Sequence, residues 1–322
     1  MPRVDAVTLR QLRILAAVAS NGSLTAAGER LGLTPSAVHA QIRNLEAALA
    51  VPLLRRADNG GGSEPTPEAA LVLEAGRRIE VALTQCAAQI TALKSGHAGR
   101  VTLGVVSTAK YFAPRLVARL RAICPDVEVV LRESNRSGVV ADLERHAVDL
   151  AIMGRPPRHP EVSATMIGPH PHGIVVPPDH PLAGRQVTIE HLLNETMITR
   201  EEGSGTRILM TRYLDTEAEG QVFDLVQMGS NETIKQAVMA GLGIAFLSLH
   251  TVMDELSHGR LALLHAPGLP ILRRWFLVYP AHVPLTPAAN RIRTEVLDLK
   301  GSFLPANDLS LASGGDRPAG KP

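Results

Sequence analysis

Near the N-terminus, apolar residues recur at helical spacing in two short segments that have clear helix starts and stops. Ser23 can cap the first helix, and Gly32 can end it in the left-handed conformation. Thr34 can cap the second helix, with Pro35 as its first residue. Apolar positions three and four residues apart then form its inward stripe: Val38, Ile42, Leu45 and Leu49. The pattern predicts two helices joined by a tight turn.

The outward face of the second predicted helix carries small or polar side chains, namely Ser36, His39, Ala40 and Arg43. Such groups can approach base edges, because a helix–turn–helix lays the start of its second helix in the major groove of DNA. An ordinary helical hairpin without any DNA contact is the alternative. The spacing alone favours DNA binding only slightly.

The residues after this helix pair favour a winged module. VPLLRR (51–56) is followed by a Gly-rich segment, and Thr66 and Pro67 can begin a new helix. A short hairpin placed between helices is typical of a wing, so we predict a winged helix–turn–helix over residues 1–65. The residues expected to meet DNA are Ser23, Thr25, Thr34, Pro35, Ser36, His39, Ala40, Arg43 and Arg56.

A long helix predicted from residue 66 to residue 94 has a seven-residue apolar repeat. The repeat comprises Val72, Ile79, Cys86 and Leu93, and Ala75, Ala82, Leu83 and Ile90 widen it. About four heptads of this kind form a coiled-coil seam, which must be buried against another helix. A second copy of the same helix is the favoured partner, and packing on the chain's own second domain is the alternative. We expect residues 66–99 to be a dimerisation helix that ends in a hinge at 94–100.

From Arg100 onward, strand patterns alternate with helix patterns. Strands are predicted at 101–106, 127–133, 149–154, 173–177, 197–201, 222–228, 243–248 and 275–280, and helices at 114–124, 139–147, 206–214, 232–242 and 284–299. This alternation indicates α/β structure with parallel sheets and right-handed crossovers, here as two Rossmann-like lobes over residues 100–304. Residues 305–322, rich in Ser, Gly, Pro and Asp, are expected to be disordered.

Hydroxyl, amide and cationic groups follow several of the predicted strands. Ligands of open α/β sheets bind beyond the carboxyl ends of strands, where helix N-termini favour anions. We therefore predict a small anionic ligand, with Lys235 as a further nearby cation and simple helix capping as the alternative role of these groups. The candidate residues are Ser107, Thr108, Lys110, Asn135, Gly154, Arg155, Ser204, Thr206, Arg207, Asn231 and Glu232.

Composition and charge limit the remaining possibilities. Formal net charge is +2, and residues 1–99 carry that whole excess, with 10 Lys and Arg against 8 Asp and Glu. This asymmetry favours DNA near the first domain only weakly. The chain has no apolar run of 18 residues and no signal-like N-terminus, so we expect a cytoplasmic protein with no membrane partner. Cys86 and Cys124 lack metal-binding spacing and are expected in the core.

Several longer strings resemble a known family. AA-x3-L (26–31), LTPSAV-xx-QI-x-x-LE (33–46), VPLLRR and TPEA resemble the DNA-binding domain of LysR-type transcriptional regulators. VVSTAKYFAPRL, DLAIMGRPP, REEGSGTR, GSNETIKQAVMAGLGIAFLS and LPILRRW resemble the RuBisCO-operon regulators within that family. The chain departs from the family at His39 and Ala40, where Ser and often Arg are usual, and its wing is less basic than is usual.

This resemblance implies a fold, partners and a role. The implied fold is a winged helix–turn–helix followed by an effector domain of the type II periplasmic-binding-protein kind. The implied partners are double-stranded promoter DNA, RNA polymerase and further copies of the chain, as a dimer or tetramer joined through the linker helix. The implied role is a regulator of carbon-fixation genes that senses a phosphorylated or reduced metabolite; an activator is expected, with a repressor as the open alternative. Regulation of another metabolic operon is the alternative.

An enzyme and a solute-binding protein are the rival interpretations. The sequence contains no HExxH, no GxSxG and no Cys/His pair at catalytic spacing, and it lacks the glycine-rich nucleotide motifs. His170 and His172 could pair on a metal, but they lie in a Pro-rich stretch and are predicted to be loop residues. We expect no metal, no cofactor and no catalysis. A solute-binding protein formed by residues 100–300 would require export.

Overall fold

The computed structural model describes residues 2–56, 62–94, 98–218 and 221–305, except the side chains of Arg56, Ala92 and Leu93. The chain forms two compact units, Met1–Ala87 and Ala88–Pro322, which we describe separately. The predicted wing tip, hinge and C-terminal tail fall largely outside the described residues. The expectations about them therefore stay predictions.

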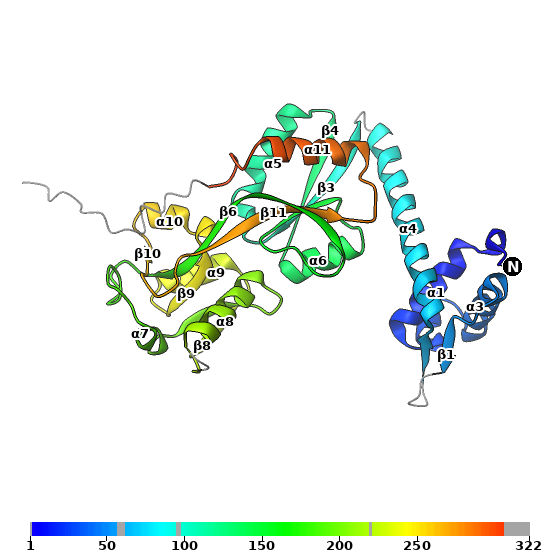
Figure 1. Ribbon diagram of the computed structural model, residues 1–322, viewed down its shortest axis with the longest axis horizontal. Coiled ribbons are helices and arrows are strands. Elements are labelled where there is room, and N and C mark those ends of the chain that lie inside the picture. The colour runs from blue at the N-terminus through cyan, green and yellow to red at the C-terminus, as the bar shows by residue number, and fades with distance from the viewer. Residues whose placement is uncertain (1, 57–61, 95–97, 219–220, 306–322) are drawn as a thin grey trace, which may run out of the picture. The chain divides into compact units, whose positions relative to one another are not determined.

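The first unit is a three-helix core with a hairpin and the start of a long helix (Figure 1). Its elements are η1 (Val4–Ala6), α1 (Leu9–Asn21), α2 (Leu24–Leu31), α3 (Pro35–Leu49), β1 (Leu54–Arg56), β2 (Ser63–Pro65) and α4 (Pro67–Lys94). Strands β1 and β2 are antiparallel, as expected of a wing. Helices α2 and α3 are the two helices predicted from the apolar spacing.

The helix boundaries in this unit follow from capping. Ser23 Oγ accepts a hydrogen bond from the Ala26 amide at 3.1 Å, and Thr34 Oγ1 accepts one from the Ala37 amide at 3.2 Å. Gly32 ends α2 with φ of +66°, which is unfavourable for residues that carry a Cβ. The inward side chains of all three helices then form one buried core, which includes Leu15, Val18, Ala27, Val38, Ile42, Leu45 and Leu53.

The second unit is built around a nine-stranded sheet with helices packed on its faces (Figure 1). Its strands are β3 (Gly99–Val106), β4 (Val127–Ser134), β5 (Leu150–Met153), β6 (Val162–Val176), β7 (Met197–Arg200), β8 (Leu225–Met228), β9 (Ile244–Ser248), β10 (Ala262–Leu263) and β11 (Ile271–Pro280). Its helices are α5 (Ala113–Ile123), α6 (Arg136–Glu144), α7 (Ile189–Leu193), α8 (Gly205–Glu217), α9 (Asn231–Met239), α10 (Met253–Ser257) and α11 (Pro287–Asp298), with short turns η2 (Ala109–Tyr111) and η3 (Leu249–Thr251).

Two lobes share this sheet. The strand order is β4-β3-β5-β11-β6-β9-β7-β8, with β10 paired to β6. Lobe I comprises β3–β5, α5, α6 and α11, and lobe II comprises α7–α10 and β7–β10. Each lobe has parallel pairs at its outer side, as predicted, and its own buried apolar cores.

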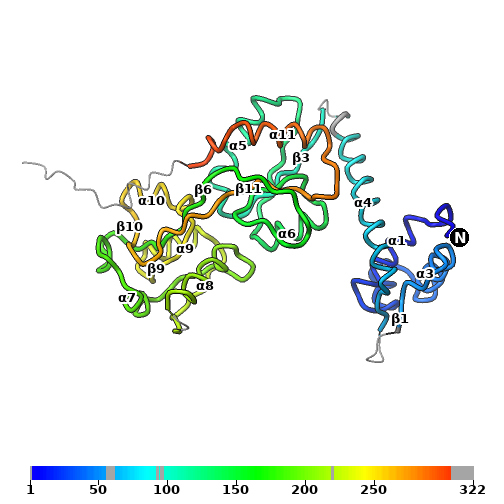
Figure 2. The backbone as a smooth tube through the Cα atoms, viewed as in Figure 1, coloured from blue at the N-terminus to red at the C-terminus, as the bar shows by residue number. Residues whose placement is uncertain are grey.

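The two long strands β6 and β11 join the lobes and correct the sequence prediction. They run antiparallel to each other and to β5 and β9, so the sheet is mixed rather than parallel. Figure 2 traces them side by side from one lobe to the other. The sequence predicted only the last four residues of β6 and the second half of β11. The unpredicted part of β6 contains Pro169 and Pro171, which lack an N–H donor and argue against a strand.

The same correction applies to the two histidines of this strand. His170 and His172 were expected in a loop, but they lie within β6 and are buried. Cys124 is buried as expected, but the expectation for Cys86 was wrong, because this residue is exposed on α4. Elsewhere, the structure adds α7, α10 and β10, which were not predicted because they are only two to five residues long. None of the helices among the described residues has the length and apolar character needed to cross a membrane.

Candidate functional site

The outward face of α3 presents the residues expected to contact DNA. Ser36, His39, Ala40 and Arg43 are all exposed, because the apolar stripe of the helix is buried on the opposite side. Ser23 and Thr34 also cap helices, so their hydroxyl groups already accept backbone hydrogen bonds. Thr25 and Pro35 are exposed as well. The side chain of Arg56 lies outside the described part of the structure.

The second unit contains a cavity of about 390 Å³ between its two lobes, here called the interlobe cavity. Lobe I contributes the ends of β3 and β5 and the start of α6, and lobe II contributes the first turns of α8. The lining residues are Val106, Ser107, Thr108, Arg136, Gly154, Arg155, Pro156, Arg158, His170, His172, Ser204, Gly205, Thr206, Ile208, Leu209, Arg212 and Arg273. This volume suits a small metabolite.

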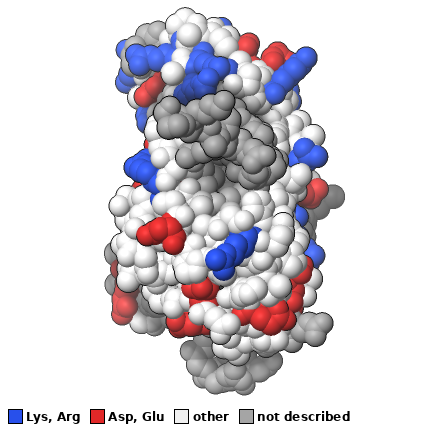
Figure 3. Space-filling view, turned by 90° about the vertical axis from the view of Figure 1, so that its left-hand side faces the viewer, with Lys and Arg blue, Asp and Glu red and all other residues white. Residues whose placement is uncertain are grey.

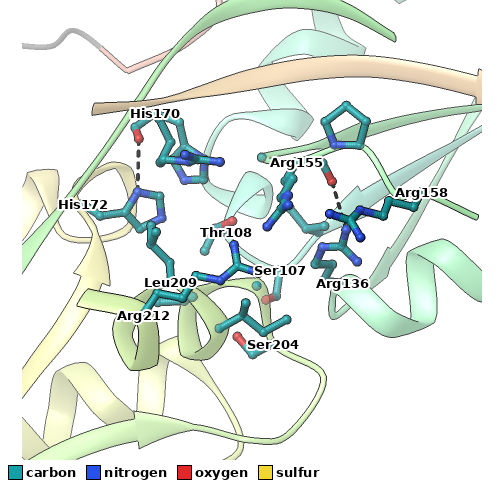
Figure 4. Close-up of a pocket in the computed structure, with 17 residues that line it drawn as sticks. Ser107, Thr108, Arg136, Arg155, Arg158, His170, His172, Ser204, Leu209 and Arg212 are labelled. Carbon is teal, nitrogen blue, oxygen red and sulfur yellow. Dashed lines mark hydrogen bonds between the residues drawn. The ribbon is translucent and has the colours of Figure 1, made fainter. Parts of the chain in front are cut away.

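Five arginines line the interlobe cavity: Arg136, Arg155, Arg158, Arg212 and Arg273. All of them except Arg273 are labelled in Figure 4. Its lining, all of which is described, includes no carboxylate. Repulsion from Arg212 lowers the pKa of Arg155, with burial and two further arginines adding to the effect. Burial lowers the pKa of Arg136, and Arg155 and Arg212 lower it further. Crowded guanidinium groups destabilise one another, and a bound anion relieves that repulsion.

This concentration of positive charge does not continue over the visible surface. The face in Figure 3 carries both basic and acidic side chains, separated by wide uncharged areas. The chain as a whole has a net charge of only +2. The arginines of the interlobe cavity therefore form a local feature of the site.

Hydroxyl groups from both lobes also reach the interlobe cavity. Ser107 and Thr108 follow β3, while Ser204 is the N-cap residue of α8 and Thr206 lies in its first turn. Thr108, Ser204 and Thr206 are almost fully buried. The start of α8 adds positive dipole charge beside the arginines, which favours an anionic ligand further.

Two imidazole rings complete the wall of the interlobe cavity. His170 stacks on Trp275 with ring centroids 3.7 Å apart, and its Nε2 lies 2.9 Å from Ser248 Oγ. Burial is the main cause that lowers the pKa of His170, and it lowers that of His172 to about 3. Both rings are therefore neutral at physiological pH. No group of three or more His, Cys, Asp or Glu side chains able to hold a metal occurs among the described residues.

Six predicted effector residues line the interlobe cavity: Ser107, Thr108, Gly154, Arg155, Ser204 and Thr206. Gly154 leaves room for the His170 ring, because a Cβ at this position would lie only 2.8 Å from His170 Nδ1. Whether these side chains bind an effector stays a prediction. Their shared location follows from strand ends and helix starts that meet across the two lobes.

The other five predicted effector residues lie outside the cavity lining. Asn135 caps α6 and donates to Glu201, and Asn231 accepts from Arg200. Lys110 forms an ion pair with Glu133, with Nζ and Oε1 3.9 Å apart. Arg207 donates hydrogen bonds to the Arg200 carbonyl and to the Gln227 side chain. Glu232 accepts from Tyr111 and pairs with Lys235. Lys235 itself is buried between Glu232 and Glu255, so it is already neutralised.

Asn135 and Asn231 belong instead to a network around Arg200, which also includes Ser107 from the cavity lining. This arginine is buried on β7, donates to Ser107 Oγ at 3.2 Å and pairs with Glu201 at 2.7 Å. Because Ser107 follows β3 and Arg200 ends β7, the network ties lobe I to lobe II. Sequence reasoning placed its residues correctly at strand ends but could not separate them from the cavity.

The sequence analysis missed four of the cavity arginines and both histidines as ligand-facing residues. Arg158 lies four residues after the predicted strand end at Gly154, within the string GRPPR, which was the available signal. Arg136 is at the start of α6, Arg212 is inside α8 and Arg273 is on β11. Nothing in the local pattern distinguishes these from solvated surface arginines.

Comparison with known proteins agrees with this architecture. The family model described as the LysR substrate binding domain matches residues 94–300, and that of the bacterial regulatory helix-turn-helix protein, lysR family, matches residues 9–70. The HTH-type transcriptional regulator CbbR of Cereibacter sphaeroides is 60% identical over 306 residues, which cover 95% of this chain and 99% of that protein. The RuBisCO operon transcriptional regulator of Allochromatium vinosum is 39% identical over 292 residues, covering 90% and 96%.

A solved structure matches the second unit specifically. The regulatory domain of CcmR from Synechocystis PCC6803, in complex with 2-PG, is 32% identical with a TM-score of 0.58. The match covers 62% of this chain and 97% of that domain. Together, the helix–turn–helix, the two-lobed unit and these relatives give one conclusion: the chain belongs to the LysR family of DNA-binding transcriptional regulators, in the group of the CbbR regulators.

Proposed function

We propose that this regulator controls carbon-fixation genes and that a small phosphorylated anion in the interlobe cavity modulates its activity. The observation that carries the proposal is the set of five arginines in a cavity whose described lining has no carboxylate. Arginine forks suit phosphate and carboxylate groups. A similar domain, that of CcmR, is known in complex with 2-PG, and similar full-length proteins are named RuBisCO operon regulators.

The location of the cavity supports a mechanism. Arg136 and Arg155 come from lobe I, whereas Arg212 comes from α8 in lobe II, so one anion can contact both lobes. A ligand that binds the closed arrangement more tightly shifts the population toward it. We infer that this shift changes how subunits pair and therefore how two recognition helices are spaced on DNA.

The proposed oligomer rests on α4. Ile79, Leu83 and Ile90 lie within this helix and are 44%, 47% and 49% exposed. A surface helix rarely leaves such a regular apolar seam in water, and a second copy of the helix would bury it. We infer a dimer through α4, with further pairing to a tetramer.

The proposal also covers the location of the protein, its macromolecular partners and its lack of catalytic activity. We propose that it acts in the cytoplasm, binds promoter DNA beside RNA polymerase as an activator, and performs no catalysis. The relatives are transcriptional regulators, which supports this role. The predicted recognition surface is centred on the exposed face of α3, with Ser23, Thr25, Thr34 and Arg56 beside it in the sequence prediction.

The test combines DNA binding with ligand titration. Mobility shift with the intergenic DNA beside a carbon-fixation operon is measured at fixed salt, with and without 2-phosphoglycolate (2-PG). We expect a sequence-specific shift whose pattern or affinity changes with 2-PG. In calorimetry, Arg155→Ala should weaken 2-PG binding tenfold or more, on the order of 1.5–3 kcal/mol for a hydrogen bond to a charged group. The control is Arg121→Ala, which removes an exposed arginine outside the cavity lining.

Two outcomes would contradict the proposal. If the wild-type protein binds no phosphorylated anion, the proposed sensing function is wrong. If Arg155→Ala and Arg121→Ala bind 2-PG with equal affinity, Arg155 does not contact the ligand. A shift with unrelated promoters only would assign the protein to another operon.

A further inference from the structure

We infer that Arg200 is a positioning residue of the effector site: it holds the Ser107 hydroxyl so that this group can only donate a hydrogen bond to a ligand. The inference rests on the proposed function, because it concerns the same cavity. It adds a residue outside the cavity lining that sets ligand affinity. It also gives a chemical reason for the ligand to favour one arrangement of the lobes.

All five N–H groups of Arg200 have partners within the described structure. Nε and Nη2 donate to the two carboxylate oxygens of Glu201 at 2.7 and 2.8 Å, and Nη1 donates to Asn231 Oδ1. Nη1 and Nη2 each donate a further bond to Ser107 Oγ, both at 3.2 Å. A guanidinium group has five N–H donors and no acceptor, so none is left for a ligand. Arg200 therefore acts on a ligand through its partners and not by direct contact.

The guanidinium group of Arg200 is held in one place. Arg200 ends β7 and is only 3% exposed. Glu201 binds it through both carboxylate oxygens, which fixes the plane of the group. Asn231, the first residue of α9, is 1% exposed and accepts from Nη1. The arginine cannot turn away from Ser107 without breaking these hydrogen bonds.

The two bonds from Arg200 decide what the Ser107 hydroxyl can do. A serine hydroxyl has two acceptor lone pairs and one proton. Both lone pairs are taken by N–H groups of Arg200, so Oγ can form a further hydrogen bond only as a donor. Among the residues that the structure describes, none accepts that bond. Ser107 lines the interlobe cavity, where Figure 4 labels it, so an acceptor of the ligand is the partner that completes it.

This arrangement favours anionic ligands in a way that a further arginine would not. Phosphate and carboxylate oxygens accept hydrogen bonds, whereas a ligand hydrogen that meets the Ser107 proton is rejected. A hydroxyl that accepts from a cationic group is also polarised and becomes a stronger donor. Because Glu201 neutralises Arg200, the ligand gains an oriented O–H group and no additional free charge.

Ser107 and Arg200 belong to different lobes, so their contact depends on how the lobes are arranged. Ser107 follows β3 in lobe I, and Arg200 ends β7 in lobe II. If the lobes separate, Ser107 loses both bonds and its hydroxyl rotates freely. An anion therefore binds more tightly to the arrangement in which Arg200 contacts Ser107. Such a difference in affinity is what a population shift requires.

A double-mutant cycle separates positioning from direct contact. Calorimetric titration of 2-PG into the full-length protein compares wild type, Ser107→Ala, Arg200→Lys and the double variant. Ser107→Ala should weaken 2-PG binding about tenfold, because a hydrogen bond to a charged group is lost. Arg200→Lys keeps the charge beside Glu201 but lacks the fork, and it should weaken binding roughly fivefold when Ser107 is present. In Ser107→Ala protein the same change should alter the affinity by less than about twofold.

Further variants guard against an effect of folding. Thermal unfolding establishes that each variant is folded, and Ser107→Ala tests the donor without any change to the buried arginine. Arg200→Gln, which lacks the fork and the charge, repeats the cycle as a second variant. The matched control is Arg260→Lys, which alters another arginine of lobe II, in an ion pair with Asp254. It should keep the wild-type affinity, because Arg260 is outside the cavity lining.

The outcomes separate this inference from the proposed function. If wild type binds 2-PG and Ser107→Ala binds it equally well, the donor role of Ser107 is wrong while the effector site stands. A folded Arg200→Lys with wild-type affinity would overturn the positioning role. The same holds if this change weakens binding equally with and without Ser107, since its effect would then not pass through the hydroxyl. If wild type binds no 2-PG, the proposed anion-sensing function fails as well.

Discussion

At the scale of single residues, the interlobe cavity contains groups that are held away from their ordinary environments. The arginines lack a carboxylate partner within the described cavity lining, and the histidines are neutral because they are buried. The crowding of the arginines opposes folding slightly and favours ligand binding, since a bound anion relieves their repulsion. Such groups mark the site more clearly than the hydroxyls, which also cap helices.

The buried histidines predict how stability depends on pH. The pKa of His172 falls from its ordinary value of 6.5 to about 3 in the folded protein, and that of His170 is lowered too. Below pH 6.5 the unfolded chain therefore binds protons that the folded chain does not bind. The free energy of unfolding should fall by about 1.4 kcal/mol per histidine between pH 7.5 and pH 5.5.

Urea unfolding at these two pH values checks this, with fluorescence of Trp275 as the signal. Trp275 is the one tryptophan of the sequence and stacks on His170, so it reports on this core directly. His172→Phe should remove about half of the fall in the free energy of unfolding between these pH values. The control His258→Phe, at an exposed position, should leave that fall unchanged. A wild type equally stable at both pH values would show that the rings are protonated in the fold.

At the scale of elements, α3 and α4 each have one face committed to the chain's own core and one face left for a partner. In α3 the committed face is Val38, Ile42 and Leu45, and the free face is polar. In α4 the free face is apolar. The proposed partners account for this difference, because DNA presents phosphates and base edges, whereas a second copy of α4 would present apolar side chains.

Substitutions on α3 should weaken DNA binding in two distinct ways. His39→Glu places a carboxylate against the negative field of DNA and should weaken binding steeply. Arg43→Ala should lower the slope of log affinity against log salt by about one, as expected for one lost phosphate contact. Mobility shift over a salt series measures both effects, with His258→Glu in the second unit as the control. If operator affinity and salt slope are unchanged in both variants, α3 does not bind in the major groove of DNA.

A charge in the α4 seam should break the proposed dimer. Ile79→Asp should cost several kcal/mol of association free energy if the seam is buried, because an unpaired carboxylate then loses its water. Light scattering should show smaller species, and operator binding should weaken with them. Thr84→Asp, on the opposite side of the heptad, is the control and should keep the wild-type size. If Ile79→Asp keeps it too, α4 is not the interface.

At the scale of the whole molecule, the central question is how an anion in one unit affects DNA binding by the other. The interlobe cavity and the recognition helix lie in separate compact units. Coupling between them therefore requires a change in the equilibrium between arrangements, since the ligand itself touches only the second unit. The network around Arg200 already joins the two lobes in the described structure, because Arg200 donates to Ser107 and Asn135 donates to Glu201.

Thr108→Val tests the coupling across both units. Thr108 is buried in the cavity wall, and valine removes its hydroxyl with little change in volume. Effector affinity should fall roughly ten- to a hundredfold, which corresponds to about 1.5–3 kcal/mol for a hydrogen bond to a charged group. DNA binding without effector should be preserved, and the DNA response should need correspondingly more effector.

Calorimetry with 2-PG and mobility shift measure the two sides of this prediction. Thr294→Val, on the exposed part of α11, removes a hydroxyl outside the cavity lining and serves as the control. Equal 2-PG affinity in Thr108→Val and wild type would show that this hydroxyl makes no ligand contact. Loss of ligand-free DNA binding would show instead that the substitution disturbs the fold.

Features that depend on neighbours along the chain could be predicted from the sequence. Helix caps such as Ser23 and Thr34, the apolar stripe of α3 and the heptads of α4 are local patterns, so their helices were predicted close to their observed bounds. The outer strands of each lobe were predicted for the same reason. The motif strings that resemble LysR-type regulators are also contiguous, and the family comparisons confirm that the chain has both domains of that family.

Which polar groups share the interlobe cavity depends instead on how distant segments pack together. Arg136, Arg212 and Arg273 come from α6, α8 and β11, and no local pattern distinguishes them from surface arginines. Strand β6 carries prolines that oppose a strand locally, yet it is held by β9 on one side and β11 on the other. Long-range pairing and burial override local preference there, because their free energy is gained only when segments far apart in sequence meet.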